Sequence, residues 1–108
     1  MGTHAMIEFK DEDESVYVFQ HFDGFPKEVI SNIKRSLEFA WQLPRFEADE
    51  FGASYIAANK PMGGGQIRIC NKENICACDY YYIVNHTGEI SVFDNYRNLI
   101  ETHNLFKL

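Results

Sequence analysis

Two apolar segments near the N-terminus indicate β-strands. Residues 7–10 form a short strand candidate, and residues 16–22 (VYVFQHF) carry β-branched or aromatic side chains at most positions. Because the second segment is apolar on both of its faces, we predict that it is a central strand covered on both sides. The acidic residues Asp11, Glu12, Asp13 and Glu14 form the turn between the two strands.

A helix is predicted directly after the second strand. Gly24 and Pro26 end the strand, and Pro26 suits the first position of a helix that runs to about residue 42. Apolar residues at helical spacing form one buried stripe along this helix: Val29, Ile30, Ile33, Leu37, Ala40 and Trp41.

A second helix is predicted from about residue 46 to residue 59. Acidic residues in its first turn suit the positive end of the helix dipole. Its buried side is expected to contain Phe51, Tyr55 and Ala58. Lys60 and Pro61 end the helix, and glycines 63–65 let the chain reverse.

The remaining chain is predicted to form three antiparallel strands and a short helix. Residues 66–71 and 75–84 flank a turn at residues 72–73, and a turn at residues 86–88 leads into a strand of residues 89–93. If Gly88 is left-handed, Val84 pairs with Ile90 and Tyr82 pairs with Val92. This register places apolar residues opposite one another on one face. The apolar positions of residues 95–103 predict a weak helix.

The element order is therefore ββααβββα, without alternation of strands and helices. This order predicts an α+β fold in which two main helices pack on a largely antiparallel sheet of about five strands. Residues 6–108 are expected to form a single domain. We interpret the first five residues, MGTHA, as a vector remnant.

Charge and composition narrow the classes of function. The chain has 16 Asp and Glu residues against 10 Lys and Arg residues. Such a surface repels phosphate backbones, which disfavours nucleic-acid binding, and it is compatible with basic protein partners. No apolar run is long enough to cross a membrane. Three cysteines cannot all pair within one chain, so a reducing cytoplasm is the expected location.

His21 and Asp23 are the closest pair with catalytic chemistry. An imidazole beside a carboxylate at a strand end can act as an acid–base unit or ligate a metal. The alternative is structural: Asp23 caps the next helix or forms a turn, Gly24 takes a positive φ, and His21 packs. Because no nucleophile or further ligand accompanies the pair, the structural interpretation is favoured.

Three cysteines and a histidine offer a second constellation, formed by Cys70, Cys76, Cys78 and His86. Their spacing lacks the CxxC knuckle of zinc sites. The predicted hairpin places Cys76 and Cys78 on the apolar face, opposite Ile69 and Ile67, so we expect both to be buried and free of metal. Glycines 63–65 follow a helix and precede a strand, which is the wrong order for a phosphate loop. Neither a metal nor a cofactor is expected.

An aromatic patch is the third candidate. Strand alternation sends Tyr81 and Ile83 to the face opposite Tyr82, and Phe93 joins them there. This patch is either covered by a helix or exposed for a partner.

Several of these segments are similar to those of a known group of proteins. Residues 16–26 (VYVFQHFDGFP), followed by an amphipathic helix, resemble small uncharacterised proteins of bacteriophages and prophages with a His-x-Asp-Gly-aromatic-Pro motif. Residues 46–49, 55–59 and 79–84 and the glycine loop are similar in placement. The resemblance implies a phage origin, and small acidic phage proteins often bind host proteins, including defence systems.

Three hypotheses follow. The first is an accessory protein that binds and modulates or inhibits a host or phage protein, through Tyr81 and Phe93 and through the acidic turn that begins at Asp11. The second is a small hydrolase or metal-dependent enzyme centred on His21 and Asp23. The third is a structural or assembly accessory that acts as a homo-oligomer.

Overall fold

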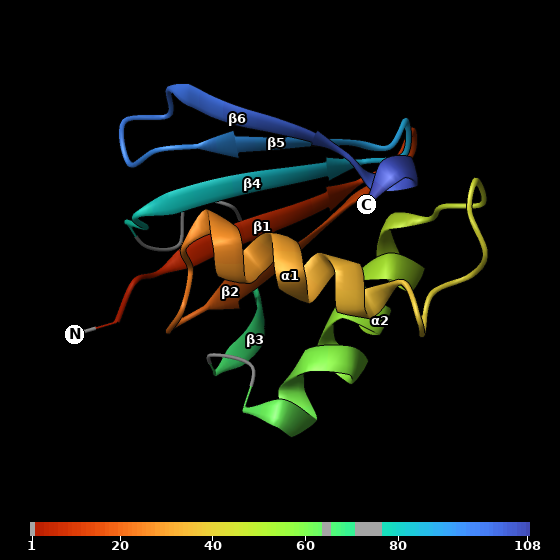
Figure 1. The fold of residues 1–108 in the computed structure, drawn as a ribbon, viewed down its shortest axis with the longest axis horizontal. Coiled ribbons are helices and arrows are strands. Elements are labelled where there is room, and N and C mark those ends of the chain that lie inside the picture. The colour runs from red at the N-terminus through yellow and green to blue at the C-terminus, as the bar shows by residue number, and fades with distance from the viewer. Residues whose placement is uncertain (1, 64–65, 71–76) are drawn as a thin grey trace.

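The computed structural model describes residues 2–63, 66–70 and 77–108 (Figure 1). Within these ranges it contains six strands, two α-helices and two short 3-10 helices. In chain order they are β1 (Ala5–Lys10), β2 (Ser15–Gln20), α1 (Pro26–Ser36), α2 (Ala48–Asn59), η1 (Lys60–Met62), β3 (Ile67–Cys70), β4 (Tyr80–Asn85), β5 (Glu89–Phe93), β6 (Leu99–Asn104) and η2 (Leu105–Lys107). β1 begins at Ala5, two residues earlier than predicted, and Ala5 is fully buried.

The strands form one mixed sheet in the order β3-β2-β1-β4-β5-β6. The α+β class is confirmed, and β2 lies in the interior of the sheet, paired antiparallel with β1 and β3. The prediction of about five strands in a largely antiparallel sheet is wrong in two details. There are six strands in the described chain, and β1 pairs with β4 in parallel. That pairing sets Ile7 beside Tyr82 and Phe9 beside Val84, which matches apolar residues on one face.

The predicted hairpin between residues 66–71 and 75–84 does not match the observed sheet. β3 pairs with β2, where Ile69 lies opposite Val18 and Ile67 lies opposite Gln20. The expected turn at residues 72–73 and Cys76 lie outside the described residues. By contrast, the β4–β5 register is confirmed, because Tyr82 pairs with Val92 and Val84 pairs with Ile90. Gly88 has a φ of 92°, as the predicted turn requires.

The C-terminal segment is a strand and not the predicted helix. Asp94 accepts hydrogen bonds through Oδ1 from the amides of Tyr96 and Asn98, both at 2.9 Å. Arg97 adopts a left-handed φ of 66°. These contacts close a tight turn that returns the chain along β5 as β6. The apolar spacing that suggested a helix belongs instead to this turn and to the start of β6.

Both α-helices pack on one face of the sheet (Figure 1). The core between the layers includes Val29 and Ile33 of α1 and Phe51 and Tyr55 of α2. The ring of Phe9 lies 5.6 Å from that of Phe51 and 5.5 Å from that of Tyr55, measured between centroids. The helices therefore cover only one face of β2; on its other face Phe19 is buried against Met6 and Cys78.

Helix α1 ends at Ser36, six residues before the predicted end. The amide of Leu37 bonds to the carbonyl of Lys34, and the amide of Phe39 bonds to that of Ser36. These three-residue bonds tighten the last turn and stop the α-helix. Helix α2 agrees with its prediction within two residues, and Phe51, Tyr55 and Ala58 are buried.

The turn that enters α1 differs from the prediction at one residue. Asp23 has the left-handed φ, at 58°, whereas Gly24 does not. Gly24 is needed for a different reason: a Cβ at this position would lie 2.7 Å from the Thr3 carbonyl oxygen and 2.8 Å from the Ala5 Cβ. The glycine therefore allows the turn to pack tightly against the start of β1.

Candidate functional site

His21 and Asp23 do not converge on a common site. His21 lines a hollow with His4, Phe19 and Cys70, whereas Asp23 lines a separate hollow between α1 and α2. The His21 ring packs 4.5 Å from Phe22 and 4.6 Å from His4, measured between centroids. The geometry therefore agrees with the packing interpretation of His21, and it does not assemble the acid–base pair of the enzyme hypothesis.

The hollow beside Asp23 is backed by a buried polar network. Gln20 is fully buried, and its Nε2 donates to the carbonyls of Phe22 at 2.9 Å and Asp23 at 3.0 Å. The Tyr55 hydroxyl donates to Gln20 Oε1 at 2.6 Å. Gln20 thus holds the left-handed turn at Asp23 in place and joins it to α2.

The same network extends to the facing surfaces of the two helices. Arg35 donates to Asn32 Oδ1 at 3.0 Å and to Asn59 Oδ1 at 2.7 Å. Asn59 donates in turn to the Asn32 carbonyl at 3.1 Å and to the Tyr55 carbonyl at 2.9 Å. These hydrogen bonds give the polar groups between the helices their partners and join α1 to α2, so we assign the network a structural role.

Two buried tyrosines complete this side of the molecule. Burial raises the pKa of Tyr55 and of Tyr82 well above the ordinary range of a phenol. The Tyr82 hydroxyl donates to the Gly24 carbonyl at 2.6 Å. Both phenols therefore remain neutral donors at physiological pH and fasten β4 and α2 to the turn that precedes α1.

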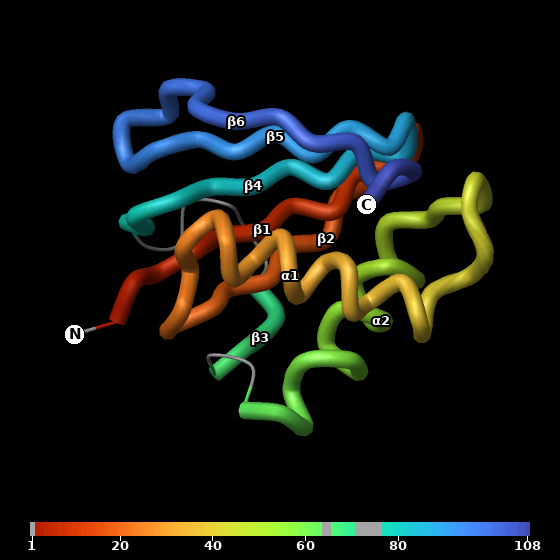
Figure 2. Tube along the Cα trace, viewed as in Figure 1, coloured from red at the N-terminus to blue at the C-terminus, as the bar shows by residue number. Residues whose placement is uncertain are grey.

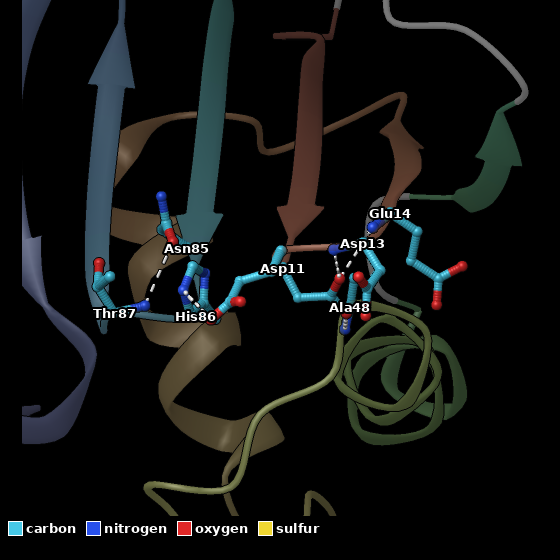
Figure 3. Close-up of polar contacts among 8 residues, drawn as sticks. Asp11, Asp13, Glu14, Ala48, Asn85, His86 and Thr87 are labelled. Atoms are coloured by element: carbon cyan, nitrogen blue, oxygen red, sulfur yellow. Dashed lines mark hydrogen bonds and ion pairs between the residues drawn. The ribbon is translucent and has the colours of Figure 1, made fainter.

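The acidic turn between β1 and β2 lies at the N-terminus of α2 (Figure 3). Asp11 Oδ2 accepts from the amide of Ala48, the first residue of α2, at 2.8 Å. Asp11 Oδ1 accepts from the amides of Asp13 at 2.8 Å and Glu14 at 2.9 Å. The hydrogen bond from Ala48, followed by the other two, lowers the pKa of Asp11. Asp11 is therefore a cap for a helix distant in sequence.

The other acidic residues of this region concentrate negative charge. The charge of Asp49 raises the pKa of Glu14, and desolvation and the charges of Asp11, Asp13 and Glu47 add to that effect. The structure thus joins two acidic segments that lie more than 30 residues apart. His86 lies beside this turn, with Nε2 at 3.5 Å from Glu12 Oε1.

The cysteine–histidine constellation is not assembled. Cys78 is buried, as predicted, but it packs with Met6 and Phe19 on the face opposite the helices. The predicted position opposite Ile67 is therefore wrong. His86 lies with the acidic turn instead. Among the described residues, no group of three or more His, Cys, Asp or Glu side chains is placed to hold a metal ion.

A single row of cross-strand neighbours crosses all six strands on the helix-free face. Each member lies opposite the next in the sheet register, which shifts beside Phe93 where β5 pairs with β6. From one edge to the other the row consists of Arg68, Phe19, Met6, Tyr81, Phe93 and Leu99. Five of its six residues are apolar.

Exposure varies along this row: Arg68 on β3 is exposed, the next two members are buried, and the members on β4, β5 and β6, the open end of the row, are accessible. Met6 is 2% exposed and Phe19 is 5% exposed, and both pack with Cys78. Tyr81 and Phe93 are half-buried, and Leu99 is 57% exposed. A hollow of about 100 Å³ opens between Met6, Tyr81 and Phe93.

Arg97 forms one wall of this hollow. Its guanidinium lies 3.8 Å from the centroid of the Tyr81 ring, in a cation–π contact. The sequence predicted the aromatic members of the patch by strand alternation. It does not reveal Arg97, because the contact depends on a turn in a segment for which the apolar spacing predicts a helix.

Comparisons with protein-family models, with curated proteins and with solved structures found no match to this chain. Within the described residues, no helix is both long and apolar enough to span a membrane.

Proposed function

We propose that the protein binds another protein through the open end of this row. The observation that carries the proposal is the change in exposure along the row. Cys78 packs on Met6 and Phe19 in the middle of the row, whereas Tyr81, Phe93 and Leu99 remain accessible toward β6. Partly exposed aromatic residues around a hollow are the usual anchors of a protein interface.

The size of the hollow limits what it can accept. Its volume is about 100 Å³. This is larger than the volume that one water molecule occupies in the liquid, about 30 Å³, and smaller than a cavity of about 150 Å³ that binds benzene. A hollow of this volume can accept one apolar side chain of a partner. The guanidinium of Arg97 on the rim can donate a hydrogen bond to a carboxylate or a backbone carbonyl of the partner beside that side chain.

The charge of the chain suggests the kind of partner. The net charge is −6, and two acidic segments meet at one end of the sheet. A basic protein would therefore associate with it faster than a neutral one. The sequence resemblance to phage and prophage proteins supports a host or phage protein as the partner, such as a component of a defence system, in the host cytoplasm. Modulation or inhibition of that partner is the corresponding activity.

Affinity capture with matched variants tests this proposal. The native chain and the variants Phe93→Asp and Phe39→Asp would each be used to capture proteins from a host lysate. Phe39 is a suitable control because it is a phenylalanine that is 55% exposed in the turn after α1 and does not line the hollow. A specific partner should be retained by the native chain and Phe39→Asp and lost with Phe93→Asp.

The captured protein would then be purified and its dissociation rate measured. Tyr81→Ser should increase the rate by at least about tenfold, because a central aromatic anchor contributes about 2 kcal/mol. Thermal melts of each variant would exclude unfolding as the cause. Equal binding by the native chain and by folded Phe93→Asp would overturn the proposal.

A further inference from the structure

Strand β6 is an open edge of the sheet. Figure 2 shows it at the margin of the molecule, with no other described element beyond it. Leu99 is 57% exposed and Ile100 is 46% exposed. An exposed edge strand presents unpaired backbone groups and is a template for another strand. The opposite edge, β3, has only four residues and carries the exposed Arg68.

The backbone of β6 offers its outer hydrogen-bonding groups at defined residues. The amide of Leu105 donates to the carbonyl of Gly88, so this amide points toward β5. Backbone groups alternate in direction along a strand. The amides of Glu101 and His103 therefore also point toward β5, and those of Thr102 and Asn104 point outward.

We propose that β6 pairs antiparallel with β6 of a second copy of this chain, about a two-fold axis at Thr102. In an antiparallel pair, a residue whose backbone N–H and C=O point toward the partner strand lies opposite another such residue. Residues of β6 whose backbone groups point away from β5 must therefore lie opposite one another in the two copies. A two-fold axis must therefore pass through a residue position and not between two of them. Within the short edge, the choices are Glu101, Thr102 and His103.

Charge and strand length select among these three registers. An axis at Glu101 would place two carboxylates directly opposite each other, which is unfavourable. An axis at His103 would pair only residues 102–104 of each β6, because Leu105, opposite Glu101, lies beyond the end of the strand, whereas an axis at Thr102 pairs residues 100–104. An axis at Thr102 places Glu101 of each copy opposite His103 of the other.

The existing contact within one chain supports the same register. His103 Nε2 lies 2.9 Å from Glu101 Oε1, so the two side chains already lie on one face. In the pair, two carboxylates and two imidazoles would alternate across the junction. The two-fold axis stands perpendicular to the sheet, so the helix-free faces of both copies lie on the same side. The dimer would then present two Tyr81–Phe93 hollows on one continuous sheet.

Sedimentation velocity over about a hundredfold range of protein concentration tests the dimer. Thr102→Pro removes an outward amide and leaves the ladder to β5 intact, so it should abolish the dimer while the chain stays folded. Thr102→Val keeps that amide and is the matched control, which should still form a dimer.

A charge exchange tests the register. His103→Glu places carboxylates opposite each other and should raise the dimer Kd by about tenfold. Adding Glu101→Lys to that variant places a lysine opposite each glutamate, so its Kd should return toward the native value. The proposal is overturned if the native chain is monomeric over the whole range, if Thr102→Pro still forms a dimer, or if the double variant does not recover. Phe93→Asp should leave the dimer intact, so failure here is distinct from failure of partner binding.

Discussion

The buried bond between Tyr55 and Gln20 allows a quantitative prediction. Tyr55→Phe removes the hydroxyl that donates to Gln20 Oε1 at 2.6 Å and accepts from Asn32 Nδ2 at 3.3 Å. It leaves Gln20 Oε1, in a residue that is fully buried, with Asn32 Nδ2 at 3.5 Å as its remaining contact. Losing the bond and leaving a buried acceptor poorly satisfied should cost about 2 kcal/mol of unfolding free energy.

The expected shift in melting temperature follows from chain length. An unfolding entropy of about 2.1 cal/mol/K per residue gives about 230 cal/mol/K for 108 residues. A loss of about 2 kcal/mol therefore lowers the Tm by about 9 °C. Urea unfolding monitored by circular dichroism would measure the free energy directly, with an unchanged m-value.

Two comparisons make this test specific. Tyr96→Phe is the matched control, because Tyr96 is 79% exposed and should lose almost no stability. In a Gln20→Leu background the Tyr55 hydroxyl has lost its acceptor, so Tyr55→Phe should become neutral or stabilising. A cost below about 0.5 kcal/mol in the native background would show that the hydrogen bond does not hold α2 to the turn.

Three further predictions concern the same framework. Burial raises the pKa of Tyr82, so the stability that its neutral phenol gives to the folded state is complete below the ordinary phenol pKa of about 10 and is lost as the pH rises further. The Tm of Tyr82→Phe should therefore fall less steeply at alkaline pH than that of the native chain. Gly24→Ala places a Cβ 2.8 Å from that of Ala5 and should cost about 1–3 kcal/mol in urea unfolding. The charge of Asp49 raises the pKa of Glu14, so the repulsion between the two carboxylates destabilises the fold once the pH rises through that pKa. Glu14→Gln should therefore have a higher Tm than the native chain at pH 7 and an equal Tm at about pH 3.

The parts of the fold that could be predicted depend on local contacts. The β4–β5 hairpin was predicted with its register because a short turn fixes which residues face each other, from Tyr82 with Val92 to Val84 with Ile90. The parallel pairing of β1 with β4 could not be predicted in this way. It joins Ile7 to Tyr82 across more than 70 residues, and only the assembled core selects it.

The candidate site shows the same division. Alternation along β4 identified Tyr81, and its pairing with Phe93 followed from the hairpin. The row itself required the pairings of β1 with β4 and of β5 with β6, so Met6 and Leu99 were not recognised. The hypothesis that His21 and Asp23 form an acid–base pair fails for a local reason: the left-handed φ of Asp23 turns its side chain to the other side of the sheet.

The acidic turn and the aromatic row make different contributions to partner binding. Three backbone amides use the Asp11 carboxylate, so a change there would disturb α2 before it altered any encounter with a partner. Glu12, Asp13 and Glu14 are exposed and can act through long-range attraction, which affects association rates. Tyr81 and Phe93 act only on contact, which affects dissociation rates. An effect on binding can therefore be assigned to either surface by its kinetics, provided that Asp11 is left unchanged.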